Sequence, residues 1–276
     1  MSIVITSSGL SAADVVAVAR HGVPVRLDAS ALDAMARGRA VVQKLAQSPT
    51  PVYGVSTGFG ALAHVAVPAA ERTDLQHAII RSHAAGIGEP VEREVVRAMM
   101  VLRLRTLASG MTGVRPEVGE LIAALLNNNL TPVVPEFGSL GCSGDLAPLA
   151  HCALALIGEG EVMDAAGIRH ASASALAAHN LSPVLLQEKE GLALINGTDG
   201  MLGMLLMALA DIDAVLDAAD ITAAASIEAL HGTDAVFDPA LHAPLRPHPG
   251  QATSADIIAR MLADSPIVAS HADDAT

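Results

Sequence analysis

Aromatic side chains are scarce in this sequence. Its 276 residues include no Trp, one Tyr and three Phe, although hydrophobic residues make up 51%. The core must therefore be built from Ala, Val, Leu, Ile and Met, which suit close helix packing better than sheet cores, where aromatic and β-branched residues are favoured. Tyr53, Phe59 and Phe137 lie in glycine-rich segments outside the periodic apolar stretches, an unusual place for scarce core material.

Basic charge and cysteine are also in short supply. Lys and Arg number 16 against 29 Asp and Glu, which gives a formal net charge of −13. An acidic chain without a basic cluster is a poor binder of nucleic acid. Two cysteines are too few for a disulfide scaffold, so a reducing cytoplasm is the expected location.

Long apolar runs are absent as well. The N-terminus lacks the charged, apolar and small-residue order of a signal peptide. No uncharged apolar run approaches the roughly 18 residues that a membrane span needs. Only 16% of the residues are charged and the mean hydropathy is +0.46, values that exclude intrinsic disorder. We expect a globular protein that binds neither membrane nor nucleic acid.

Helical patterns cover most of the chain. Capping residues, apolar periodicity and Pro or Gly stops predict helices over 11–22, 30–47, 71–84, 91–108, 116–126 and 198–231, and from Pro148 and Ser254 onward. The helix over 91–108 is expected to be amphipathic, and Thr198 is placed to cap the longest helix. Residues 161–170 have the pattern of a hairpin, while 131–145 and 239–251 are predicted loops. The expected fold class is mainly α with minor β.

The segment Gly138–Asp145 (GSLGCSGD) holds the tripeptide Cys142-Ser143-Gly144. A bare tripeptide of this kind is most often a flexible turn. A serine nucleophile of the G-x-S-x-G type is excluded because Gly144 directly follows Ser143. Cys142 and Cys152 lack the spacing of metal ligands, so the sequence requires no metal.

A different chemistry fits this tripeptide. The Gly144 amide nitrogen can attack the carbonyl carbon of Cys142 with loss of water, and Ser143 can then lose its hydroxyl as a second water. The product is a five-membered ring with an exocyclic methylidene, an electrophile that no ordinary side chain provides. Gly144 offers an unhindered nitrogen and backbone freedom, and a rigid loop is needed to press the atoms together.

Three further segments are candidates for the same site. Tyr53 lies in a glycine-rich segment that we interpret as a lid; the alternatives are a half-buried packing residue and a weak dinucleotide motif over 58–63. His83 shares a helix face with apolar residues. The alternative to a role in the site is a partly buried histidine whose ring is hydrogen-bonded within the protein. Asn196 precedes Gly197, where a role in a turn is the alternative.

Together these segments resemble one family. PVYGVSTGFG, RSHAAG, GSLGCSGDLAPLAH and KEGLALINGTDGM occur in the order and at the spacings of the ammonia-lyases that use a methylidene-imidazolone prosthetic group, and most of all of their histidine-specific branch. The resemblance runs from near the N-terminus to the last residues. It implies a prosthetic-group domain over residues 1–197 and the beginning of a central helical bundle over 198–276.

The resemblance also implies the chemistry. The tripeptide Cys142–Gly144 would form 4-methylidene-imidazol-5-one autocatalytically, with no external cofactor, and Tyr53 would be the catalytic tyrosine in the loop above it. Asn196 would lie near the group. His83 would select the substrate, because an imidazole can hydrogen-bond another imidazole. The implied reaction removes ammonia from L-histidine to give trans-urocanate, the first step of histidine degradation, in a homotetramer.

The resemblance leaves alternatives open. Full-length members of the family continue into a loop with a further Tyr and an Arg that would bind the substrate carboxylate, so we expect this chain to be the N-terminal part of that length. A tyrosine or phenylalanine lyase, or an aminomutase, would use the same group on another substrate. A non-catalytic fragment that assembles with a full-length chain is the remaining possibility.

Overall fold

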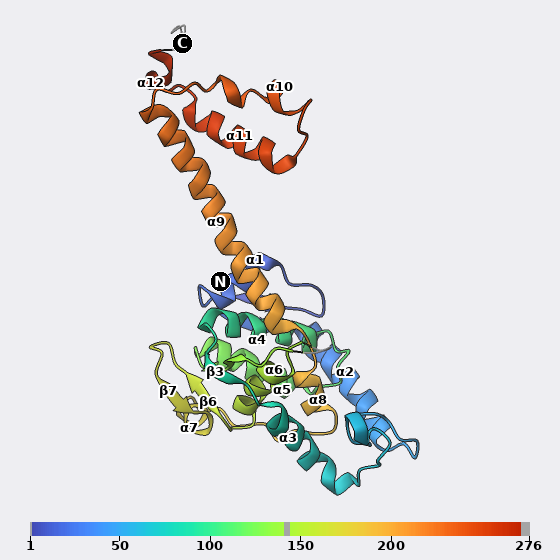
Figure 1. Ribbon diagram of the computed structural model, residues 1–276. Coiled ribbons are helices and arrows are strands. Elements are labelled where there is room, and N and C mark those ends of the chain that lie inside the picture. Colours follow the sequence, from blue (N-terminus) through green and yellow to red (C-terminus); the bar gives the residue numbers. More distant parts are fainter. Residues whose placement is uncertain (1, 141–143, 272–276) are drawn as a thin grey trace. The chain divides into compact units, whose positions relative to one another are not determined.

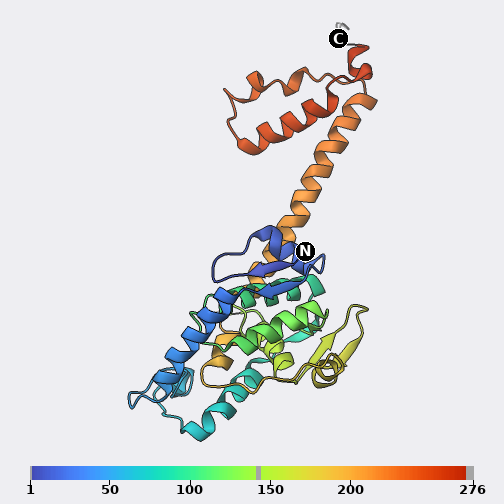
Figure 2. The same cartoon turned by 180° about the vertical axis from the view of Figure 1, so that it is seen from behind.

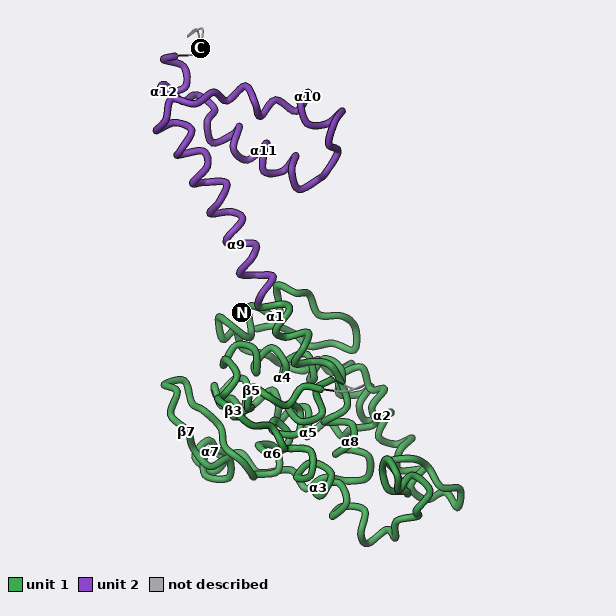
Figure 3. The backbone as a smooth tube through the Cα atoms, in the orientation of Figure 1, with its two compact units in different colours: residues 1–207 green, residues 208–276 purple. Residues whose placement is uncertain are grey.

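The computed structural model describes residues 2–140 and 144–271, and most of them are helical (Figure 1). The predicted fold class, mainly α with minor β, is confirmed. The chain divides into two compact units, Met1–Met207 and Ala208–Thr276 (Figure 3). The boundary between them falls inside the long helix α9 (Asp199–Ala229).

The first unit is a helical body with small sheets. Its elements before α9 are β1 (Ile3–Ile5), α1 (Ala12–Ala19), β2 (Val25–Leu27), α2 (Ala29–Ala46), η1 (Gly60–Leu62), η2 (Ala69–Glu71), α3 (Arg72–His83), β3 (Ile87–Pro90), α4 (Arg93–Ala108), α5 (Pro116–Asn127), β4 (Thr131–Pro132), β5 (Pro135–Phe137), α6 (Leu146–Leu156), β6 (Glu161–Met163), β7 (Arg169–Ala171), α7 (Ser172–Ala178) and α8 (Glu190–Ile195). Helices α1, α2 and α5 pack on α4, while α3, α6 and α8 form a second group. In both views the hairpin β6–β7 lies at the edge of this unit (Figures 1 and 2).

Local capping explains where several helices begin. Helix α1 opens with a capping box at Ser11, which confirms the helix predicted from that residue. Helix α2 is capped by Asp28, whose carboxylate accepts from the Ser30 N–H, so it begins before the predicted start at residue 30. Helix α6 begins at Leu146, ahead of the predicted start at Pro148, because a proline is tolerated in the first turn, where its missing N–H has no helical partner.

Helix α4 is the centre of the core of the first unit. An amphipathic helix is predicted here, but nearly every residue over 95–108 is buried, including Arg97 and Arg103. Arg97 donates to the Val18 carbonyl at 2.9 Å and to the Leu126 carbonyl at 3.1 Å, at the C-terminal ends of α1 and α5. Burial lowers the pKa of this guanidinium to about 10. The predicted polar face is wrong because these arginines bind backbone carbonyls inside the protein instead of facing water.

Short strands join these helices. Strands β1 and β2 pair in parallel, β3 and β5 pair antiparallel, and β4, β6 and β7 form an antiparallel sheet. The predicted hairpin is confirmed, with Val162 of β6 opposite His170 of β7. The prediction of an unbroken loop over 131–145 is wrong, because β4 and β5 lie within it and pair with strands far away in the sequence.

The second unit contains the remainder of α9 followed by short elements. These are η3 (Ala235–Phe237), α10 (Pro239–His242), α11 (Pro249–Leu262) and α12 (Pro266–Ala269). The predicted loop over 239–251 and the predicted start at Ser254 are wrong, because α10 and α11 each begin at a proline in the first turn. Over 2–140 and 144–271, no helix combines the length and apolar character that a membrane span requires.

Candidate active site

Three helices that pack on one another carry predicted site residues at their ends. Helices α3, α6 and α8 are in mutual contact (Figure 1). His83 is the last residue of α3, Gly144 lies just before α6, and Asn196 is the C-cap of α8. The packing of these helices therefore determines how the three motifs meet.

The glycine-rich segment before α6 lies between the other two motifs. A Cβ atom added at Gly138 would lie 3.4 Å from the Cα atom of Gly86, in the RSHAAG segment. A Cβ atom added at Gly144 would lie 3.2 Å from Cγ2 of Thr198, in the INGTD segment. The structure thus brings three of the candidate segments together.

A hydrogen bond joins the two residues that flank the segment 141–143. The Leu140 N–H donates to the Gly144 carbonyl at 2.8 Å, and Gly144 has a φ of 72°, in the left-handed region that favours glycine. A Cβ atom there would also lie 2.7 Å from Sδ of Met201. The backbone of Gly144 therefore favours glycine, and the hydrogen bond brings residues 140 and 144 close together. The two other ring residues predicted, Cys142 and Ser143, lie outside the described residues.

Asp145 is a buried acid that the sequence analysis missed. Its Oδ2 accepts from the N–H groups of Gly200 and Met201 at 2.8 and 3.0 Å, and its Oδ1 accepts from Ser139 Oγ at 2.8 Å. Thr198 is the predicted N-cap of α9, but the N–H groups of Gly200 and Met201 donate to the carboxylate of Asp145 instead. The carboxylate therefore ties Ser139 and Asp145, on either side of the segment 141–143, to the positive N-terminal end of α9.

Arg103 of α4 holds the backbone at Asn196. Its Nη1 donates to the carbonyls of Ala193 and Asn196 at 3.1 and 3.2 Å, and its Nη2 donates to the carboxylate of Asp199. Burial raises the pKa of Asp199. Asn196 is itself exposed. Its backbone is thus fixed from the core while the residue stays accessible to a substrate.

His83 presents one defined ring nitrogen. Its Nδ1 lies 2.8 Å from the Ile79 carbonyl. Because a carbonyl oxygen only accepts, Nδ1 carries the proton of the neutral ring, and Nε2 is left as an acceptor. His83 is partly exposed, whereas Ile79 is buried. The ring is therefore anchored through one edge and can receive an N–H donor at the other.

A second histidine, His151 of α6, has no counterpart among the predicted residues. Its Nε2 lies 3.1 Å from the Gly86 N–H and must accept, because an amide nitrogen only donates. Burial lowers the pKa of His151, which favours the neutral ring that this bond requires. His151 therefore fastens the chain that follows His83 to α6.

Tyr53 lies in the loop between α2 and α3 and is 51% exposed. Its ring packs edge-on against Phe59, with centroids 6.2 Å apart. The backbone of this loop approaches α8 at Gly54, where a Cβ atom would lie 2.8 Å from Cδ2 of Leu192. Tyr53 also lines a cleft of about 460 Å³ together with Lys189. The loop therefore meets the site through α8, while the tyrosine ring packs within the loop.

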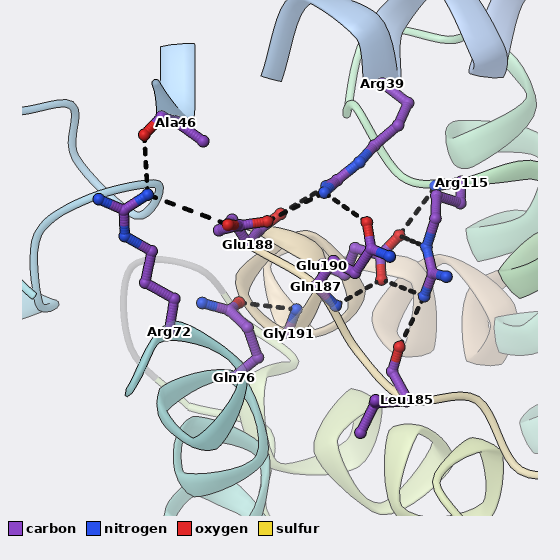
Figure 4. Close-up of polar contacts among 10 residues, drawn as sticks. All are labelled: Arg39, Ala46, Arg72, Gln76, Arg115, Leu185, Gln187, Glu188, Glu190 and Gly191. Carbon is purple, nitrogen blue, oxygen red and sulfur yellow. Dashed lines mark hydrogen bonds and ion pairs between the residues drawn. The ribbon is translucent and has the colours of Figure 1, made fainter. Parts of the chain in front are cut away.

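A network of charged side chains holds the segment that leads into α8 (Figure 4). Glu190 is fully buried and accepts from the Arg115 guanidinium at 2.9 Å and from the Gln187 N–H at 2.8 Å. The bonds to Glu190 raise the pKa of Arg115. Glu188 pairs with Arg39 at 3.1 Å. The sequence analysis assigned no role to Glu188 and Glu190. Two acids next to an apolar motif, in a chain with few charged residues, could have indicated buried ion pairs.

The family profile described as aromatic amino acid lyase matches residues 10–276. This chain belongs to the aromatic amino acid lyase family. The fold agrees: tyrosine aminomutase from Streptomyces globisporus matches with a TM-score of 0.90 at 34% identity, over 97% of this chain and 50% of that one. Histidine ammonia-lyase from Trypanosoma cruzi matches with a TM-score of 0.85 at 31% identity, over 94% and 50%.

Sequence relatives point to one branch of the family. Histidine ammonia-lyase from Streptomyces griseus is 60% identical over 274 residues, which are 99% of this chain and 53% of that protein. The enzyme of the same name from Deinococcus radiodurans is 48% identical over 256 residues, 93% of this chain and 48% of that protein. This chain spans about half the length of the curated relatives it matches.

Proposed function

We propose that this chain serves as part of a histidine ammonia-lyase, a carbon–nitrogen lyase that converts L-histidine to trans-urocanate and ammonia. The observation that carries the proposal is the left-handed turn at Gly144, held against the segments that bear His83 and Asn196. The identity of 60% to a histidine ammonia-lyase supports the choice of substrate.

We infer that Cys142, Ser143 and Gly144 form the methylidene-imidazolone group. The fit at Gly144 supports this, because its φ of 72° lies in the left-handed region that favours glycine. Asp145 and Ser139 would hold the turn in place through their 2.8 Å bond. When formed, the group supplies an electrophilic carbon to the reaction.

The roles of the other residues follow from their chemistry. Nε2 of His83 would accept a hydrogen bond from the substrate imidazole N–H, since Nδ1 is engaged with Ile79. Tyr53 Oη would take the proton from the substrate Cβ, and this residue is 51% exposed and so accessible to a substrate. Asn196, with its backbone held by Arg103, would bind near the prosthetic group.

The proposal extends to domains and assembly. Residues 1–197 would form the prosthetic-group domain, and residues 198–276 would form the beginning of a helical bundle. A protein of the family's full length would assemble as a homotetramer. Exposed apolar side chains along α9 support a bundle that continues beyond this chain: Leu209, Ile212, Val215, Leu216 and Ile221. The cytoplasm is the proposed location, because the chemistry needs no oxidising compartment.

Two measurements test the proposal. The intact mass of the folded protein should be lower by two water molecules than its sequence requires, and L-histidine should yield trans-urocanate and ammonia. A full mass would contradict ring formation. Preference for tyrosine or phenylalanine in parallel assays would support the lyase or aminomutase alternative, and the aminomutase structures matched at a TM-score of 0.90 justify that comparison. Turnover of L-histidine by this chain alone would contradict the non-catalytic alternative. Inactivity that is rescued by a partner carrying the remaining half of the family's length would support a split enzyme.

The substrate role of His83 has its own test. His83→Leu should reduce turnover of L-histidine more than it changes the mass deficit, because the imidazole acts on the substrate and not on the turn at Gly144. Undiminished turnover would show that His83 does not select the substrate.

A further inference from the structure

Arg72 is the first residue of α3, at the end of the loop that carries Tyr53. A cation in the first turn of a helix is unfavourable, because the N-terminus already carries partial positive charge. The side chain of Arg72 is nonetheless only 14% exposed. Its position therefore calls for partners outside α3.

Those partners are the two ends of the Tyr53 loop. Nη1 of Arg72 donates to the carbonyl of Ala46, the last residue of α2, at 2.8 Å. Nε donates to the carbonyl of Val67 at 3.2 Å. One planar guanidinium thus joins the chain where the loop leaves α2 to the chain where it returns toward α3, and a guanidinium has the separate donors that this requires.

The returning chain pairs with the part of the loop nearest Tyr53. The Val67 N–H donates to the Ser56 carbonyl at 2.9 Å, and the Gly58 N–H donates to the Val65 carbonyl at 3.0 Å. The contact of Arg72 with Val67 is therefore transmitted through backbone bonds to within a few residues of the tyrosine.

The same guanidinium faces the segment that leads into α8 (Figure 4). Nη1 of Arg72 lies 3.9 Å from Oε1 of Glu188, and Arg39 anchors Glu188 by donating to its carboxylate and to its carbonyl at 3.1 and 2.8 Å. Asn196 caps the helix that follows. Arg72 therefore contacts both the loop of Tyr53 and the segment that leads into α8, the helix at whose C-terminal end Asn196 lies.

We propose that Arg72 is a positioning residue: with the carbonyls of Ala46 and Val67 and the carboxylate of Glu188 it forms a clasp that sets the Tyr53 loop against α8. The inference rests on the proposed function for its effect on turnover, but its effect on the loop does not. The clasp acts on Tyr53 through the loop and does not touch the substrate.

Hydrogen exchange measured by mass spectrometry tests the clasp without any need for activity. In Arg72→Gln, amides over 52–67 should exchange about tenfold faster or more, because two bonds to a charged donor are lost. Amides over 116–127 should keep their rates. Arg72→Lys should give an intermediate rate, since one ammonium cannot serve both carbonyls and Glu188. Arg260→Gln, at a well-exposed pair in the second unit, is the matched control and should change nothing in the loop.

Turnover provides the second readout. Arg72→Gln should lower kcat for L-histidine about 10- to 100-fold, because small misplacements of a catalytic group are costly. KM should stay within about threefold, since His83 and Asn196 lie outside the loop, and Arg72→Lys should restore part of kcat. Glu188→Gln, which keeps its shape and bonds to Arg39 while losing charge, should raise loop exchange less than Arg72→Gln.

The outcomes separate the clasp from the proposed function. Unchanged loop exchange in Arg72→Gln, or an equal rise over 116–127, would overturn the clasp even if L-histidine is turned over. Faster exchange confined to the loop would support the clasp even if L-histidine is not turned over. A full intact mass, without the loss of two waters, would overturn the proposed function and leave the clasp standing.

Discussion

At the scale of the residue, Gly144 has the most demanding position in the candidate site. Its φ of 72° is strained for any L side chain, and the space for a Cβ atom is taken by Met201. Gly144→Ala should therefore lower the free energy of unfolding by about 1–3 kcal/mol and prevent the loss of two waters. Urea unfolding and intact mass measure the two effects. Gly250→Ala is the matched control, because a Cβ atom at Gly250 meets open space; equal stability of the two variants would contradict the geometry.

His151 should make the free energy of unfolding depend on pH. Burial lowers its pKa in the folded protein, so between that pKa and the ordinary value of about 6.5 the unfolded chain binds a proton that the folded chain does not. The stability that His151 contributes is present above about pH 6.5 and is lost as the pH falls toward the folded pKa. The free energies of unfolding of the unaltered protein and of His151→Gln, measured at several pH values, should approach each other as the pH falls. A difference that grows in acid would refute this assignment.

Cys152 of α6 is partly exposed at the residue level, but its thiol lies within the protein, and it offers a check of the packing around α6. Burial raises the pKa of its thiol to about 12, so almost no thiolate exists near neutral pH. Alkylation of the folded protein at pH 8, followed by peptide mapping, should leave Cys152 unmodified, whereas unfolding in urea should expose it within the same time. Rapid labelling of this peptide in the folded state would show that the helices around α6 open readily.

At the scale of the element, helix α8 depends on a buried ion pair. Glu190 is fully buried and satisfies both the backbone and the side chain of Arg115. Glu190→Ala should lower the free energy of unfolding by about 3 kcal/mol or more, because it leaves a guanidinium poorly paired. The double variant with Arg115→Met should be less destabilised than the sum of the two single variants, since removal of both partners leaves no orphan charge. Strict additivity in urea unfolding would mean that the two residues act independently.

At the scale of the whole molecule, α9 leaves apolar side chains uncovered. Val215 and Leu216 are 67% and 56% exposed, alongside similar residues on neighbouring turns. Such a surface favours association with other helices. The protein should therefore sediment above monomer mass, and Val215→Glu with Leu216→Glu should shift it toward the monomer. Asp217→Ser, on the same helix, should leave the distribution unchanged; a monomer at high concentration without any substitution would count against assembly through α9.

Local patterns account for much of what could be predicted. The capping box at Ser11, the hairpin over 161–170 and the extents of α3 and α5 follow from neighbouring residues alone, so the sequence suffices for them. The predicted starts of α2, α6 and α11 differ from the observed ones. Asp28 as a cap, and a proline in the first turn, can begin a helix as well as the residues chosen from the sequence. The family motifs could be found because each is a short contiguous string.

The sequence by itself determined the family, the helical class and a core without aromatic residues, because composition, periodicity and motifs are local properties. Only the tertiary structure decided how the site is held. Arg103 reaches the carbonyl of Ala193 from 90 residues away, and Asp145 reaches the first turn of α9 from 55 residues away. A buried charge finds its partner through the packing of whole helices, and no pattern of neighbouring residues specifies that partner.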